Sequence, residues 1–298
     1  MYGSPERLNL GPLAAERHGA GGRAPVVLVH GFAQNRFSFD CPQRSMARWL
    51  ANQGWEVYNL ELRGHGLSDG SAEGGFEDYV ADLVEACAAL DRPFVVGHSL
   101  GGAVAYGAAS RVSMRGVVGI GAIWQFAQHQ RFLRLVSRLT LKMPILLNRA
   151  RVRSKAGGVV MSRLMGLSDT AAWWAPLSGW WPGSIEPDLL ATRLHRGFDY
   201  TTVQVWLDMA GWAVSGDTVA TWNANAPPLL CIVGDEDHLM PEGDARGAYD
   251  THPGDCTLLV LDDFKHEVHW GHLDLVLGRH AERFVWPAVD AWMRVRGS

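Results

Sequence analysis

The sequence predicts an α/β fold with a doubly wound, mostly parallel sheet and one inserted helical segment. Three observations carry this prediction. Short apolar runs recur along the chain, segments with helical spacing separate them, and one long stretch interrupts the rhythm. Apolar runs that alternate with helices are typical of parallel strands that are buried on both faces and joined by right-handed crossovers.

The apolar runs give the expected strands. The first is 25–29 (PVVLV), a continuous apolar run without polar alternation, which is typical of a central strand. The others, in chain order, are 55–62, 94–96, 115–122, 228–233 and 256–261. Residues 8–18 carry a weaker pattern broken by Gly and Pro, which predicts an edge hairpin or an ordered tail.

The segments between these runs give the expected helices. Apolar residues recur at helical spacing in 46–50, 76–90 and 281–293, and small residues fill 102–109. Strand and helix therefore alternate along most of the chain. This order predicts a single sheet covered by helices on both faces.

The interruption covers residues 125–215. It has helical spacing over 132–141 and 203–214 but no strong strand pattern, and the strand rhythm resumes at 228. We therefore expect one core domain formed by 1–124 and 216–298, with 125–215 as a helical cap inserted in it.

Tryptophan is concentrated in this cap. The chain has thirteen tryptophans, and the cap contains the adjacent pairs Trp173-Trp174 and Trp180-Trp181. Neighbouring residues do not share one helix face, so a helix cannot bury both members of a pair on the same side. Some of these rings should therefore line or cover a cleft. The alternative is that they form the core of the cap.

Composition narrows the class of protein. The 298 residues are 47% hydrophobic and 19% charged, with a formal net charge of −4. A chain of this kind is not expected to bind nucleic acid or an anionic membrane. It contains no apolar run of the roughly 20 residues that span a bilayer. Residues 1–22 lack the pattern of a secretory signal, so we expect a cytoplasmic location.

The four cysteines do not suggest a disulfide framework. Cys87 falls in a helical pattern and Cys231 in an apolar strand, while Cys41 and Cys256 complete the set. Free buried thiols fit these positions better than disulfides do. We expect no cofactor.

The chemistry centres on residues 93–102 (PFVVGHSLGG). A short apolar strand precedes the G-x-S-x-G pattern of Gly97 to Gly101, and a helix of small residues follows it. This order is that of a nucleophile elbow, in which a tight turn lifts the serine above the sheet edge. Ser99 is the candidate nucleophile, and it needs a neighbouring base to take its proton.

Four blocks carry a family resemblance. They are 30–32 (HGF), 62–68 (LRGHGLS), 97–102 (GHSLGG) and 234–241 (GDEDHLMP), and they resemble the recurring blocks of the α/β-hydrolase superfamily in its usual order. Residues 270–274 (WGHLD), followed by Gly278, are similar to the histidine block of its acid-lipase-like branch. The resemblance implies the α/β-hydrolase fold and the serine esterase and lipase-like branch.

The resemblance also orders the candidate base and acid after the nucleophile. It favours His272 as the base; His266 is the second candidate, because it lies closest to the last strand, and His269 is expected to be a bystander. The spacing of these histidines does not match H-E-x-x-H, so we expect no metal.

Two aspartates follow the strand at 228–233. The family's G-x-x-D spacing before a proline implies Asp237 as the acid, while Asp235 fits a turn-forming residue. The end of the strand at 115–122 has no carboxylate, so the other position where the superfamily sometimes keeps its acid is empty.

The expected oxyanion hole follows from the same blocks. The backbone N–H groups of Phe32 and Leu100 are the expected oxyanion hole, the pair of donors that stabilises the charged intermediate. We place four side chains at the substrate site: His30, Trp124, Trp173 and Trp181. His30 and Gly31 would shape the oxyanion loop, where Gly31 allows a close backbone approach.

These residues predict a serine hydrolase that cleaves a small, apolar carboxylic ester through an acyl-enzyme on Ser99. Acyl transfer to an alcohol or thiol is one alternative, and a catalytically silent ligand-binding module on the same scaffold is another. Haloalkane dehalogenase or epoxide hydrolase chemistry would need a carboxylate at the elbow, where this chain has serine.

Overall fold

The computed structural model describes residues 4–19, 21–69, 74–142, 151–152 and 179–297. Among these residues, eight strands form one sheet in the order β1-β2-β6-β3-β7-β8-β11-β12. The strands of this sheet are β1 (Glu6–Leu10), β2 (Leu13–His18), β3 (Pro25–Val29), β6 (Glu56–Leu60), β7 (Phe94–His98), β8 (Gly116–Ile120), β11 (Leu229–Gly234) and β12 (Cys256–Leu261).

The six strands from β6 to β12 in the sheet order are parallel to their neighbours, as predicted. Every residue of β3, β7, β8 and β11 is buried, because helices cover both faces of the sheet. The weak pattern of residues 8–18 is the antiparallel hairpin of β1 and β2 at one edge. The predicted fold class is confirmed.

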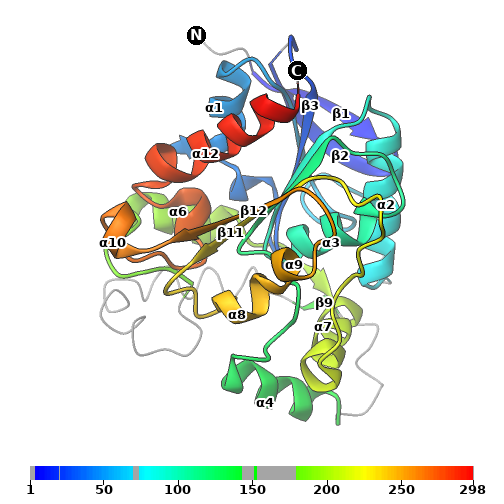
Figure 1. Ribbon diagram of the computed structural model, residues 1–298, viewed down its shortest axis with the longest axis vertical. Coiled ribbons are helices and arrows are strands. Elements are labelled where there is room, and N and C mark those ends of the chain that lie inside the picture. Colours follow the sequence, from blue (N-terminus) through cyan, green and yellow to red (C-terminus); the bar gives the residue numbers. More distant parts are fainter. Residues whose placement is uncertain (1–3, 20, 70–73, 143–150, 153–178, 298) are drawn as a thin grey trace.

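Two hydrophobic cores lie on opposite faces of the sheet (Figure 1). Helices α2 (Phe76–Ala88) and α3 (Leu100–Ala109) cover one face. Helices α1 (Met46–Asn52) and α12 (Ala281–Arg296) cover the other. The expected thiols are free in the structure, and three of the four are buried.

The chain between β8 and β11 contains three longer helices among its described residues: α4 (Arg131–Thr140), α6 (Pro187–Arg196) and α7 (Val203–Ser215). Helices α4 and α7 pack against each other beyond the lower end of the sheet in Figure 1. The sequence pattern predicted α4 and α7 but not α6, which begins at Pro187 in the first helical turn.

The remaining elements are short. They are η1 (Arg36–Ser38), β4 (Asp40–Cys41), β5 (Arg44–Ser45), β9 (Arg151–Val152), β10 (Thr201–Thr202), α8 (Glu242–Ala245), α9 (Gly247–Asp250), α10 (Asp263–His266) and α11 (Asp274–Leu277). No described helix has both the length and the apolar composition that crossing a membrane requires.

Candidate active site

Ser99 occupies the turn between β7 and α3. Its φ of 56° and ψ of −122° lie in a region that residues other than glycine rarely adopt. The backbone N–H of Ser99 donates to the carbonyl of Ile120 in β8, which fixes the turn to the neighbouring strand. Backbone strain of this kind often occurs at functional sites.

Two glycines make this turn possible. A Cβ on Gly97 would lie 2.4 Å from the carbonyl oxygen of Gly101, and a Cβ on Gly101 would lie 2.1 Å from that of Val29. Both distances are far below a van der Waals contact. The strand, the turn and the helix therefore approach one another at distances that exclude a side chain at either position.

A buried Asp–His pair lies at the carboxyl ends of the same strands. The Nδ1 atom of His272 is 2.6 Å from the Oδ2 atom of Asp237, and both side chains are at most 3% exposed. Asp237 Oδ1 accepts hydrogen bonds from the backbone N–H groups of Leu239 and Met240. Because Asp237 accepts the Nδ1 proton, the Nε2 atom of His272 is left as the basic nitrogen.

Gly121 explains why this pair fits at the end of β8. A Cβ on Gly121 would lie 3.1 Å from both Asp237 Oδ2 and His272 Nδ1. The φ of Gly121 is +49°, which also favours glycine. The end of β8 has a glycine instead of a carboxylate residue. The space that this leaves is filled by Asp237 and His272, which come from two other loops.

His98 supports the loop that carries His272. Its Nε2 lies 3.1 Å from the backbone carbonyl oxygen of His272, and the two rings are 4.5 Å apart. Burial, followed by the nearby His272, holds the pKa of His98 well below its usual value. A neutral His98 carries a proton on Nε2 and donates it to that carbonyl.

His30 is buried at the end of β3 and joins two loops. Its Nε2 accepts from the backbone N–H of Leu62, so Nδ1 carries the proton and donates to the carbonyl of Gly31. Burial lowers the pKa of His30 well below its usual value. His30 therefore fixes the backbone on which Phe32 lies.

The two N–H groups expected as the oxyanion hole are available. Among the described residues, neither the backbone N–H of Phe32 nor that of Leu100 donates to a protein atom. Leu100 begins α3, where the helix dipole also favours negative charge. A built Cβ on Gly31, which precedes Phe32, would lie 3.0 Å from the Cβ of Ser99, so this loop passes directly beside the nucleophile.

Ser99 and His272 both line a cavity of about 250 Å³. Most of its other described walls are apolar, and many come from the chain between β8 and β11. They include Leu133 on α4, Trp180, Leu194 on α6, Phe198, and Trp206 on α7. Gln34 is the one further amide or charged side chain in this lining among the described residues.

Of the four expected substrate-site side chains, the three that the structure describes do not belong to the described lining of this cavity. Trp124 is 3% exposed and stacks on Trp222 at 5.1 Å, because the core on that face of the sheet encloses both rings. His30 lies beneath the oxyanion loop. Trp181 packs on His269, and its neighbour Trp180 lines the cavity instead. Trp173 lies outside the described residues.

The remaining candidates, one aspartate and two histidines, contact residues other than those of the cavity. Asp235 Oδ2 lies 2.6 Å from His269 Nδ1, and this pair is partly exposed. The hydrogen bond between His269 and Asp235 raises the pKa of His269. His266 is on α10, where its ring contacts Phe284, and it does not line the cavity. Of the candidates, the structure thus places His272, bonded to Asp237, at the cavity that Ser99 also lines.

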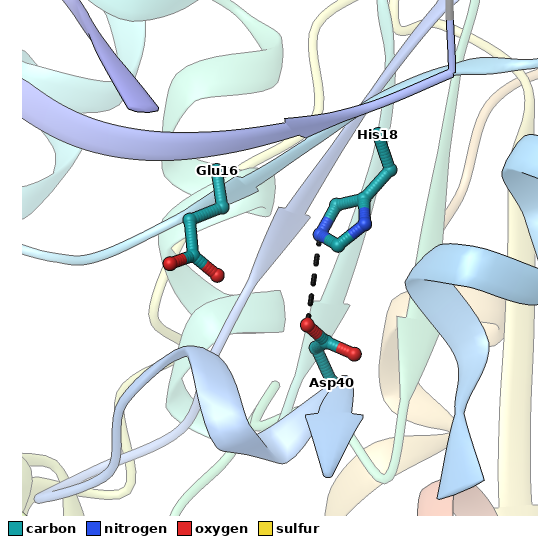
Figure 2. Close-up of side chains that lie close together, drawn as sticks. All are labelled: Glu16, His18 and Asp40. Atoms are coloured by element: carbon teal, nitrogen blue, oxygen red, sulfur yellow. Dashed lines mark ion pairs between the residues drawn. The ribbon is translucent and has the colours of Figure 1, made fainter. Parts of the chain in front are cut away.

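A second histidine–carboxylate cluster lies at the edge hairpin (Figure 2). Glu16 and His18 on β2 point towards Asp40, and His18 Nε2 is 3.7 Å from Asp40 Oδ2. Arg36 pairs with Glu16 at 3.1 Å, and Arg48 pairs with Asp40 at 3.1 Å. Because guanidinium groups already neutralise both carboxylates, we assign this cluster to an ion-pair network rather than to a cation site.

Comparison with protein families identifies the scaffold. The model of the alpha/beta hydrolase family matches residues 26–288. The chain belongs to this family. The match covers the whole sheet from β3 onwards, including the elbow and both loops that supply Asp237 and His272. The search of curated proteins by sequence found no significant match.

Several solved structures resemble this hydrolase at low identity. A thermophilic esterase from Thermogutta terrifontis is 20% identical, with a TM-score of 0.59 over 98% of this chain and 100% of that one. A monoacylglycerol lipase from Paleococcus ferrophilus is 18% identical, with a TM-score of 0.63 over 96% and 99%. Epoxide hydrolase A from Mycobacterium thermoresistibile is 19% identical, with a TM-score of 0.63 over 98% of each chain. At these identities the likeness shows the fold alone.

Proposed function

We propose that this protein is a serine hydrolase that cleaves carboxylic esters of apolar acyl groups. Ser99 is the nucleophile, His272 the base and Asp237 the acid of the triad. The observation that carries the proposal is the buried hydrogen bond between Asp237 and His272 beside a cavity that Ser99 also lines. A silent binding module has no need of a buried, oriented base next to a strained serine.

The reaction would proceed in two halves. His272 Nε2 takes the proton of the Ser99 hydroxyl as its oxygen bonds to the ester carbonyl carbon. The carbonyl oxygen becomes negative and accepts hydrogen bonds from Phe32 N–H and Leu100 N–H. The bond to the alkoxy oxygen then breaks, and His272 returns the proton to the leaving alcohol. Water, deprotonated by His272, releases the acid from Ser99 in the same way.

Residues 125–215 form the cap in this proposal, inserted between 1–124 and 216–298. Half of the cavity's described lining comes from this range, including Leu133 and Trp206, which supports a role in substrate binding. Because the lining is largely apolar, each buried methylene of the acyl chain would contribute about 0.8 kcal/mol. The expected substrate is therefore neutral, with a short or medium acyl chain.

The serine at the elbow favours ester chemistry over the epoxide chemistry named for one structural neighbour. The thioesterase domain from a curacin biosynthetic pathway is a further neighbour, at 14% identity and a TM-score of 0.62. A thioester carbonyl could react with the same triad, and comparing acyl thioesters with p-nitrophenyl esters of the same acyl chain separates the two substrate classes. Acyl transfer to an alcohol or thiol instead of water is the remaining alternative, and product analysis with an added alcohol or thiol tests it.

Two measurements test the proposal. A fluorophosphonate should label Ser99 of the wild-type protein and leave Ser99→Ala unlabelled. The p-nitrophenyl esters from acetyl to octanoyl should show kcat/KM rising with chain length before steric limits reverse it. Labelling at another residue, or an active Ser99→Ala variant, would refute the triad.

A further inference from the structure

An arginine without a carboxylate partner is buried beside the active site. Arg193 on α6 is 1% exposed, and burial lowers its pKa to about 10. Among the described residues, its Nε and Nη1 atoms have no hydrogen-bond partner, and no carboxylate forms an ion pair with it. A buried unpaired charge is costly, so its retention calls for an explanation beyond packing.

Arg193 begins a chain of hydrogen bonds that ends in the cavity. Its Nη2 donates to the hydroxyl of Ser38 at 3.1 Å, and Ser38 Oγ donates to Oε1 of Gln34 at 2.8 Å. Gln34 lines the cavity together with Ser99 and His272. The three linked side chains are all buried.

These two hydrogen bonds fix the orientation of the Gln34 amide. Arginine can only donate, so Ser38 accepts from Arg193 and uses its own proton for Gln34. The oxygen of the Gln34 amide must then face Ser38, and the positive charge of Arg193 favours the same orientation. The Nε2 group is left without a hydrogen-bond partner among the described residues. Its two N–H donors remain available to a ligand.

The amide lies on the oxyanion side of the nucleophile. A Cβ built on Gly31 would lie 3.0 Å from Ser99 Cβ and 3.3 Å from Gln34 Oε1, so Ser99 and Gln34 flank the same face of Gly31. The next residue along the chain is Phe32, whose free N–H is one of the two expected oxyanion donors. Gln34 thus brings an amide of the cavity lining to the side of Ser99 on which the oxyanion loop lies.

We propose that Gln34 donates a third hydrogen bond to the substrate carbonyl oxygen as it becomes negative, and that Ser38 and Arg193 fix the amide in the orientation that permits this. The inference rests on the proposed esterase function. Gln34 is then a catalytic residue, while Ser38 and Arg193 are positioning residues. The buried guanidinium acts through a hydroxyl and an amide rather than by touching substrate.

The decisive variant is Gln34→Met, which keeps the length of the side chain and removes the donor. Loss of one oxyanion donor should lower kcat by roughly 100- to 1,000-fold at unchanged KM, because the bond forms only in the transition state. The inhibition constant of an alkyl trifluoromethyl ketone, which forms an oxyanion on Ser99, should rise by a similar factor. Gln43→Met, an exposed position bonded to Thr192, is the matched control and should match wild type.

Ser38→Ala and Arg193→Met test the orientation. Each should lower kcat several-fold while Gln34 is still present, and neither should lower it further in the Gln34→Met background. Arg193→Met should also unfold at the wild-type temperature or above, because it removes an unpaired buried charge. Effects on kcat that add fully to that of Gln34→Met would overturn the relay.

The two proposals fail in different ways. Fluorophosphonate labelling of Ser99 in the wild type tests the esterase mechanism and does not depend on Gln34. If Ser99 is labelled but Gln34→Met keeps wild-type kcat, or raises only KM, the third donor is refuted and the esterase proposal stands. If the wild type is not labelled, the esterase proposal falls and this inference falls with it.

Discussion

Two Asp–His pairs come from the same two loops and have the same length. Asp237–His272 and Asp235–His269 are each 2.6 Å apart. The first pair is at most 3% exposed and faces a cavity, whereas the side chains of the second are 21–33% exposed and pack against Trp181. Hydrogen-bond length therefore does not distinguish a candidate catalytic pair from a structural one.

Burial and direction distinguish them. In the inner pair, Asp237–His272, Nδ1 of His272 is bonded to Asp237 and the His272 side chain lines the cavity. The outer pair, Asp235–His269, closes a loop: Asp235 Oδ1 accepts from the backbone N–H of Trp270, and His269 Nε2 lies 3.5 Å from Asp263. In the esterase proposal the inner pair moves a proton during each turnover. The outer pair holds the loop that carries His272.

The largest expected effect separates the two aspartates. Asp237→Asn should lower kcat by roughly 10³- to 10⁴-fold without unfolding the protein, since the imidazole loses its orienting acceptor. Asp235→Asn should lower kcat less than about 10-fold. Steady-state kinetics on a p-nitrophenyl ester measures both. The reverse order would mean that His269 serves Ser99.

The adjacent tryptophans extend the comparison to the substrate. Trp180 lines the cavity and Trp181 contacts the outer pair. Trp180→Ala should therefore remove much of the expected gain in kcat/KM per methylene, which is about fourfold for 0.8 kcal/mol. Trp181→Ala should keep the chain-length profile. An unchanged profile in Trp180→Ala would place the acyl chain elsewhere in the cavity.

A third aspartate in this region is expected to act on stability alone. Asp274 is buried, its Oδ2 accepts hydrogen bonds from the backbone N–H groups of Trp181 and Gly271, and its Oδ1 lies 2.6 Å from Ser184 Oγ. Because the Ser184 hydroxyl has one proton and the carbonyl of Trp181 can only accept it, a protonated Asp274 is the donor to Ser184. Burial raises its pKa to about 7. The folded state therefore binds the proton more tightly than the unfolded state, and stability should rise as pH falls from about 7 to the ordinary aspartate pKa of about 4.

Asp274→Asn tests this. The amide oxygen can accept both N–H groups, and its NH₂ can donate to Ser184, whose hydroxyl also donates to the carbonyl of Trp181. The variant should be more stable than wild type at pH 8 by on the order of a few kcal/mol, with little difference near pH 4. Urea unfolding at both pH values measures this. A variant that is less stable at pH 8 would show that the charged form is the favoured one.

The smallest expected effect is that of replacing His269, the histidine of the outer pair. Asp235 raises the pKa of His269, so the charged pair stabilises the fold fully below the unfolded pKa of about 6.5 and loses this as pH rises through the folded pKa. Solvent screens the pair, which limits the gain to less than about 1 kcal/mol. The difference in Tm between wild type and His269→Gln should be largest below pH 6 and vanish near pH 9.

The sequence predicted those features that depend on local pattern. Continuous apolar runs located β3, β7, β8 and β11, and the elbow was visible because Gly97 and Gly101 are needed within two residues of Ser99. The motif order also identified Asp237 and His272, which the fold brings within 2.6 Å. Each of these features can be predicted from neighbouring residues or from the spacing that is typical of the family.

Features that depend on distant contacts were out of reach. Arg193 donates a hydrogen bond to Ser38, which lies 155 positions earlier in the sequence. A pattern of apolar residues does not show which arginine will be buried without a carboxylate partner. Trp124 was placed at the substrate site, but its stacking partner Trp222 lies in a loop far along the chain. Of the pair Trp180-Trp181, only the fold decides which ring faces the cavity.

The glycine at the end of β8 restricts how this active site could have changed during evolution. A Cβ built on Gly121 would lie 3.1 Å from Asp237 Oδ2 and 3.1 Å from His272 Nδ1, the two members of the inner pair. A mutation to aspartate there, which would move the acid to the other strand used in this superfamily, would collide with the existing acid and base before it could replace them. In the esterase proposal the two acid positions therefore exclude each other, because a carboxylate at residue 121 would need the space that Asp237 and His272 fill.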